Sequence, residues 1–199
     1  MKNLFTAILV SLVCLSAGCA PDLGLRISPP DVPSLQEEKK VLNETKPLAG
    51  VKVKVAPFLD GRGSDALAII DGRSVPSDGA VGASVQAGFE RQIREAGGRI
   101  AVLQASTIEG EVADWQAKIK PSFPMSEVVA NAKVKITVRG LRSEVLYRGT
   151  YGGEARKQDP FLGERDVQTA LGDAMARAIS AAVSDEVMAQ QLLGATQTR

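Results

Sequence analysis

The groups available for chemistry in this chain are limited, because its 199 residues include no histidine. Without imidazole there is no Ser-His-Asp triad, no Cys-His dyad and no histidine-bound metal ion. Carboxylates remain, and an envelope glycan hydrolase would need two of them roughly 5 to 9.5 Å apart across a cleft. The candidates are Asp60, Asp65, Asp71, Glu109, Glu111 and Asp114. Glu109 and Glu111 lie two residues apart on one predicted strand and so share a face, which favours a solvated surface over a catalytic cleft. We therefore expect no enzymatic activity, no bound metal ion and no cofactor.

The second reactive group is the thiol of Cys19, which directly follows the small residues 16–18. Lys2 and an apolar run over residues 4–15 come before them. A positive residue, a short apolar run and small residues form the layout of a secretory signal. The run is shorter than the roughly 20 residues that span a bilayer as a helix. We therefore predict a cleaved signal peptide.

The site of cleavage has two interpretations. An ordinary signal peptidase could cut nearby, up to Ala20. Small residues leading directly into cysteine instead resemble the lipobox of a bacterial lipoprotein signal, although Ser16 stands where leucine is commonest. That resemblance implies cleavage between Gly18 and Cys19 and lipidation of the Cys19 sulfur. Acyl chains such as palmitate would anchor the chain stably, at about 0.8 kcal/mol per buried CH₂.

Composition restricts the partners of the mature chain. Cys14 and Cys19 are the only cysteines, so no intramolecular disulfide forms after cleavage. Lys2 accounts for the formal charge of +1, and the remaining side chains sum to zero. Aromatic residues make up 4%. A neutral chain with few aromatic residues is not expected to bind nucleic acid.

Four segments are predicted along the chain. They are a signal peptide (1–18), a lipidated N-terminus with a flexible tether (19–48), one folded domain (49–194) and a tail (195–199). Five prolines punctuate the tether, and its apolar residues are too scattered to build a core.

Apolar periodicity predicts the elements of the domain. Alternation over 51–55 indicates a strand, and residues 66–75 indicate a hairpin around Asp71-Gly72. A helix is expected over 80–96 with Asp78 as its N-cap, and a long alanine-rich helix over 164–193. Four more strands are expected at 99–103, 108–119, 128–138 and from 145 to about 151.

The strand over 108–119 changes its apolar phase between Val112 and Ala113, which predicts a β-bulge there. The strand over 128–138 has one apolar and one charged face, so helices should cover only one side of the sheet. The predicted fold is α+β: a two-layer sandwich of a mostly antiparallel sheet with two helices on one face, in the order β-α-β-β-β-β-α.

Two loops carry the residues predicted to contact a partner. Asp60, Arg62 and Asp65 lie in a glycine-rich stretch that lacks the signatures of a phosphate or calcium loop and favours ordinary turns. Phe123 and Met125 lie beside two prolines, where apolar side chains are either tucked under the sheet or form a contact patch. We expect the tucked arrangement.

The lipobox, the proline-bearing tether, the strand 51–55 and the helix before Gly97-Gly98 occur here in the order seen in the YajG family of bacterial lipoproteins. The strand pair 108–119 and 126–140 and the alanine-rich last helix continue the likeness. The chain thus resembles that family, whose fold is similar to the N-terminal domain of TolB. The resemblance implies an accessory role through protein contact, with no catalytic residues to carry over.

These observations predict a lipoprotein anchored at the periplasmic face of the bacterial outer membrane. The enterobacterial sorting rule would place an aspartate after Cys19 for retention in the inner membrane, and Ala20 stands there. The favoured role is a non-catalytic binding or assembly accessory of an envelope protein complex. The alternatives are an oligomeric structural or secretion-pore-associated subunit and, less favoured, a carboxylate-based glycan hydrolase.

Overall fold

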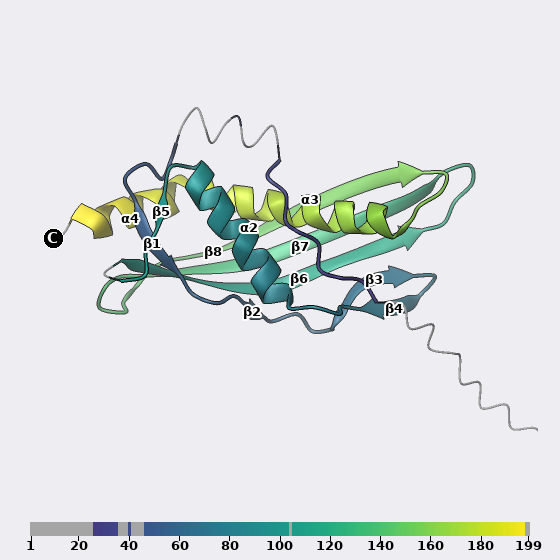
Figure 1. The fold of residues 1–199 in the computed structure, drawn as a ribbon, viewed down its shortest axis with the longest axis horizontal. Helices are drawn as coiled ribbons and strands as arrows, with labels where there is room; N and C mark the ends of the chain where they lie inside the picture. Colours follow the sequence, from purple (N-terminus) through teal and green to yellow (C-terminus); the bar gives the residue numbers. More distant parts are fainter. Residues whose placement is uncertain (1–25, 36–39, 41–45, 104, 198–199) are drawn as a thin grey trace, which may run out of the picture.

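Three long antiparallel strands form the centre of the sheet (Figure 1). They are β6 (Ser106–Lys120), β7 (Ser126–Arg139) and β8 (Val145–Asp159). The computed structural model describes residues 26–35, 40, 46–103 and 105–197. Along β7 nearly every second residue is buried, so one face of the strand packs on the core and the other meets solvent.

Five short strands extend the sheet beside β6. They are β1 (Lys52–Val55), β2 (Leu59–Asp60), β3 (Ala66–Ile70), β4 (Arg73–Pro76) and β5 (Arg99–Ile100). The first three pair with β6 in parallel, β5 is parallel to β1, and β4 closes an antiparallel hairpin with β3. Parallel pairing is therefore confined to short contacts around an antiparallel centre.

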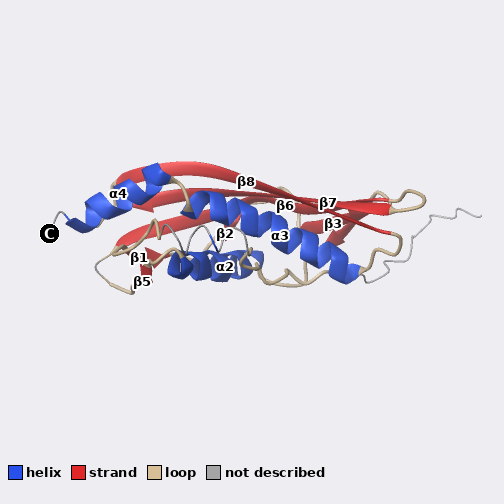
Figure 2. Cartoon of the chain, turned by 90° about the horizontal axis from the view of Figure 1, so that it is seen from above, coloured by secondary structure: helices blue, strands red, loops and turns tan. Residues whose placement is uncertain are grey.

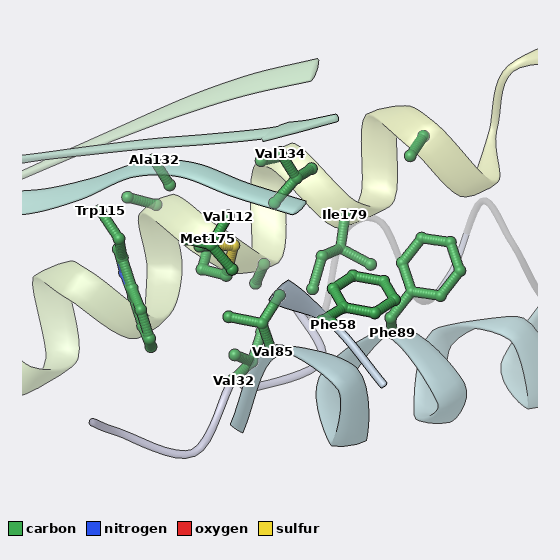
Figure 3. Close-up of a cluster of buried hydrophobic side chains, with 14 of the residues drawn as sticks. Val32, Phe58, Val85, Phe89, Val112, Trp115, Ala132, Val134, Met175 and Ile179 are labelled. Atoms are coloured by element: carbon green, nitrogen blue, oxygen red, sulfur yellow. The ribbon is translucent and has the colours of Figure 1, made fainter. Parts of the chain in front are cut away.

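The helices lie on one side of the sheet (Figure 2). They are α2 (Val81–Glu95), α3 (Glu164–Val183) and α4 (Glu186–Gln197). Val81, Val85, Phe89 and Ile93 recur every four residues on α2 and are all buried. Figure 3 shows two of them, Val85 and Phe89, in the core. Phe89 packs against Phe58 of the loop before β2, with ring centroids 5.3 Å apart, near Ile179 of α3. The predicted two-layer α+β sandwich is confirmed.

The bulge predicted in the strand over 108–119 is confirmed. Pairing of β6 with β7 passes from Val112 to Asp114, so Ala113 is the extra residue. The extra residue changes which alternate side chains of β6 face the core. Both Val112 and Trp115 therefore face the helices and have no exposed surface. The predicted hairpin is also confirmed, with Asp71 and Gly72 at positive φ in its turn.

Two element boundaries differ from the prediction. The strand expected over 99–103 ends at Ile100, and Val102 and Leu103 are each 80% exposed. The N-cap of α2 is Ala80, and Asp78 does not cap it. The carboxylate of Asp78 instead accepts a hydrogen bond from Ser28 Oγ at 3.1 Å.

The long closing helix predicted over 164–193 is two helices. α3 ends at Val183, and α4 begins at Glu186 and continues to Gln197. The break is held by Asp185, whose Oδ1 accepts the backbone N–H of Met188 at 2.9 Å and so caps α4. The other carboxylate oxygen of Asp185 contacts two tyrosines of β8, so tertiary contacts stabilise the break.

The longest described part of the predicted tether, residues 26–35, is packed on the domain. Ile27 and Val32 are each 1% exposed and belong to the core. Val32 lies among the core side chains in Figure 3, and a Cβ at Gly88 of α2 would overlap it. Arg91 donates a hydrogen bond to the Val32 carbonyl at 2.7 Å. This segment is therefore part of the fold, which the sequence prediction missed.

Candidate functional site

The predicted lipidation site and cleavage position, Cys19 and Gly18, lie outside the described residues. The described chain begins at Arg26, seven residues after Cys19. Ile27 makes a parallel bridge with Ser77, and its N–H donates to the Pro76 carbonyl at 3.2 Å. Within the described part of the chain, no helix is long and apolar enough to cross a membrane.

Arg62, one of the predicted contact residues, is engaged inside the domain. Its guanidinium donates to both carboxylate oxygens of Asp60, at 2.8 and 2.9 Å, and reaches the Trp115 carbonyl at 3.5 Å. The Arg62 side chain is only 5% exposed. These hydrogen bonds hold the pKa of the Asp60 carboxyl below its ordinary value. Arg62 thus braces the loop and offers little surface to a partner.

Asp65 lies in the same loop, and its environment confirms turn chemistry. Its carbonyl accepts the N–H of Ser77 at 3.0 Å, while the hydroxyl of Ser64 accepts the N–H of Ala66 at 3.1 Å. The loop lies at the level of Trp115 on β6. Phe123 lies beyond the end of β6 at Lys120, which is five residues and about 17 Å further along the strand. The structure therefore separates the predicted contact residues into two places.

The second place is an exposed end of the molecule that we call the apolar tip, formed by Phe123, Met125 and Phe161. Their exposed fractions are 98%, 42% and 89%. Asp159 of β8 pairs with Ser126 of β7, so the loops after β6 and after β8 leave the sheet at the same end (Figure 1). The expectation that Phe123 and Met125 are tucked under the sheet was wrong, because both side chains are exposed beyond the end of β6.

Phe161 was missed in the sequence, although its loop has the same signal as that of Phe123. Each phenylalanine lies in a short uncharged segment, over 121–125 and 160–163, that contains proline. Behind the tip, Ile27, Ile119, Leu162 and Val167 line an apolar pocket of about 190 Å³. Apolar groups therefore continue from the core to the exposed end.

The candidate carboxylates are not gathered in one cleft. Glu109 pairs with Arg139 at 2.8 Å and Glu111 with Lys135 at 2.7 Å, both between β6 and β7. Asp60 pairs with Arg62, and Asp71 lies in the turn after β3. Asp114 and Glu154 border an open depression of about 390 Å³ around Gly152. The face of β6 and β7 that carries these ion pairs is suited to charge-paired contacts along an open sheet.

A separate polar cluster joins β8 to the break between α3 and α4. The hydroxyls of Tyr147 and Tyr151 lie 2.6 Å apart, and they donate to Asp185 Oδ2 at 2.8 and 2.9 Å. Gly149 lies between them on the strand, and a Cβ there would come within 2.6 Å of the Tyr147 hydroxyl. The missing side chain lets the two phenols converge.

Electrostatics of this cluster favour a charged Asp185 and neutral tyrosines. Burial alone would raise the pKa of Asp185, but hydrogen bonds from the Met188 N–H and the two phenols outweigh it and lower that pKa. Burial raises the pKa of Tyr147 and of Tyr151. The cluster therefore functions as an anion held by fixed donors, and it locks the helix break.

We predict that Asp185→Asn lowers the free energy of unfolding near neutral pH by about 1 to 2 kcal/mol, because a half-buried acceptor of three hydrogen bonds loses its charge. The folded pKa is lowered, so this stabilisation is complete above the unfolded pKa of about 3.9 and is lost as pH falls through the folded pKa. In urea unfolding at neutral and acidic pH, the free energy of unfolding should fall less on acidification in the variant than in the wild type. The exposed Asp65→Asn is the control, and an equal loss at both pH values in Asp185→Asn would contradict the prediction.

No family model and no curated protein matches the sequence. Among solved structures, the chain is similar to the crystal structure of protein XCC0632 from Xanthomonas campestris, of family DUF330, with a TM-score of 0.53 and 11% identity. That match covers 85% of this chain and 95% of the other. At this identity the likeness establishes a shared fold.

Two further structures are similar at lower scores. A minor lipoprotein from Acinetobacter baumannii matches with a TM-score of 0.40 and 10% identity, over 74% of this chain and 94% of that one. A putative lipoprotein from Caulobacter crescentus matches with a TM-score of 0.39 and 10% identity, over 78% and 98%. The YajG family itself stays a prediction from the sequence pattern.

Proposed function

We propose that this protein is a lipoprotein of the bacterial outer membrane, anchored through Cys19 with its domain on the periplasmic face. The observation that carries the proposal is the sequence of small residues 16–18 leading directly into the cysteine at the end of a short apolar run. Ala20 in the position after the cysteine supports the outer membrane over the inner one.

The role we propose for the domain is that of a non-catalytic accessory that binds an envelope protein complex. The support is the character of its surface: an open sheet face where Glu109 and Glu111 are matched by cations of the next strand. Such rows of paired charges give specificity and orientation to protein contacts rather than acid–base chemistry.

The anchor is tested by intact mass of the protein extracted from membranes. We expect the wild-type chain to begin at Cys19 and to carry acyl chains, and Cys19→Ala to lose both the added mass and the membrane association. Cys14→Ala is the matched control, because it removes the other thiol but leaves the cleavage site intact, so its product should match the wild type. An unmodified wild-type chain in the soluble fraction would refute the anchor.

The accessory role is tested by affinity purification of the acylated protein from detergent-solubilised envelopes. We expect one envelope complex to be enriched with the wild type, and a variant with both ion pairs reversed, Glu111→Lys with Lys135→Glu and Glu109→Arg with Arg139→Glu, to lose it. Recovery of no specific complex would count against the role.

A second candidate function is an oligomeric structural subunit. It is favoured by β8, a strand of 15 residues that pairs only with β7 in the described sheet and so forms an edge. Unpaired strand edges are templates for pairing with another chain. Arg177 occupies one edge acceptor by donating to the Glu154 carbonyl at 2.9 Å. A discrete multimer on sizing in mild detergent would support this candidate, and a monomer would argue against it.

A further inference from the structure

The apolar tip holds the two most exposed large apolar side chains of the described residues. Phe123 is 98% exposed and Phe161 is 89% exposed, and both lie beyond the ends of long strands. We propose that the tip inserts into the lipid bilayer that carries the anchor, so that the domain docks end-on against the membrane. This proposal rests on the proposed lipidation of Cys19.

The first described residue, Arg26, lies on the side of Ile27 that faces the tip. β6 ends at Lys120 before the tip loop, β3 is parallel to β6, and β4 runs back antiparallel to β3. The segment at Ile27 is parallel to β4, because it bridges to Ser77 in that sense. Arg26 therefore lies on the tip side of Ile27.

The length of the connection matches the distance. Arg26 is the seventh residue after Cys19, and this length of chain can span at most about 25 Å. Ile27 lines the pocket behind the tip together with Ile119 and Leu162, the neighbour of Phe161, so the tip lies within that span. An anchor on so short a connection keeps the bilayer close to the domain, and it reaches the level of the tip when extended.

The chemistry of the two tip loops suits a lipid environment. Residues 121–125 and 160–163 carry no charged side chain. Polar groups in and beside them are satisfied locally: Ser122 Oγ donates to the Met125 carbonyl at 2.6 Å, and the Phe161 N–H donates to Asp159 at 2.8 Å. Inserting the outer parts of these loops would bury two aromatic rings, while the flanking charges of Lys120, Asp159 and Glu164 would stay at the level of the lipid headgroups, as in an interfacial anchor.

At the opposite end of the long strands, the loop between β7 and β8 carries charges, although Val102 and Leu103 near that end are each 80% exposed. The β7–β8 loop exposes Leu141, at 53%, beside Arg142 and Glu144. The Glu144 carboxylate accepts the N–H of Arg142 at 3.0 Å. A bilayer would have to desolvate these charges, so this end provides a matched control position for an exposed apolar side chain.

The test uses the chain from residue 19 to 199, which contains every described residue and a single thiol at Cys19. That thiol is coupled to maleimide lipids in phosphatidylethanolamine–phosphatidylglycerol vesicles whose acyl chains are brominated to quench tryptophan. Phe123→Trp and Leu141→Trp each place a reporter at one end. The native Trp115 is fully buried and gives both variants the same background.

We expect the reporter of Phe123→Trp to shift to shorter wavelength and to be quenched on coupling, while that of Leu141→Trp is not. In uncoupled chains, Phe123→Ser with Phe161→Ser should weaken partitioning into the same vesicles about tenfold for each ring removed. Equal or absent quenching at both ends would overturn the proposal. Because the coupling is chemical, this failure is distinct from failure of lipidation, which the intact mass reports.

Discussion

Replacing Trp115 by alanine is expected to lower the free energy of unfolding by about 3 to 5 kcal/mol, the range measured for removing a large aromatic side chain from a core. Trp115 has no exposed surface and lies between the sheet and α3 (Figure 3). Its indole N–H also donates to the Leu171 carbonyl of α3 at 2.9 Å. The side chain thus joins the two layers by both packing and a hydrogen bond.

Two further variants separate these contributions. Trp115→Phe keeps most of the apolar volume but loses the hydrogen bond, so we expect a smaller loss than for alanine. The exposed Leu141→Ala should change stability by no more than about 0.5 kcal/mol. Urea unfolding followed by circular dichroism measures all three. A midpoint for Trp115→Ala equal to that of the control would show that the layers are not joined at this residue.

The sequence predicted the sheet well because strand patterns are local. Alternation places Val134 and Ile136 on one face of β7 and Lys133 and Lys135 on the other, and this holds in the structure. Even the bulge at Ala113 followed from the local change of phase. Local periodicity reports which face is buried, and in an antiparallel sheet with one covered face that determines the register.

The break at Asp185 could not be predicted in this way. The apolar stripe continues from Val183 to Met188 without proline or glycine, so the pattern indicates one helix. The groups that fix the break, Tyr147 and Tyr151, come from 38 and 34 residues earlier in the chain. Exposure of the apolar tip is equally non-local, because it depends on where the helix layer ends.

The prediction for residues 26–35 failed for the same reason. Four prolines and dispersed apolar residues over 21–33 indicate a solvated linker, whereas the described residues 26–35 place Ile27 and Val32 in the core. The partners of this segment are distant: Val32 fits where Gly88 has no side chain, and the Pro30 carbonyl accepts a hydrogen bond from Ser84 at 2.5 Å. A single glycine in a helix gives no local sign that it leaves space for another segment.

We therefore predict that a chain beginning at residue 46 is less stable than the chain from residue 19 by about 3 to 6 kcal/mol. Ile27 and Val32 are each 1% exposed, and burying one such side chain contributes roughly 1.5 to 3 kcal/mol. If the sequence-based tether over 19–48 were correct, the two chains would instead unfold at the same urea concentration, which makes the comparison decisive.

Point variants test the segment without truncation. Val32→Ala and Ile27→Ala should each lower stability, whereas Leu141→Ala should not. A second consequence concerns the membrane: with residues 26–35 docked, only six residues, 20–25, connect Cys19 to the fold, so Val32→Asp should release the segment and lengthen the connection. In the lipid-coupled vesicles, the quenching of the Phe123→Trp reporter should then fall while the coupling is unchanged. Unaltered quenching in a chain whose segment is released would show that the tip holds the bilayer without help from the short connection.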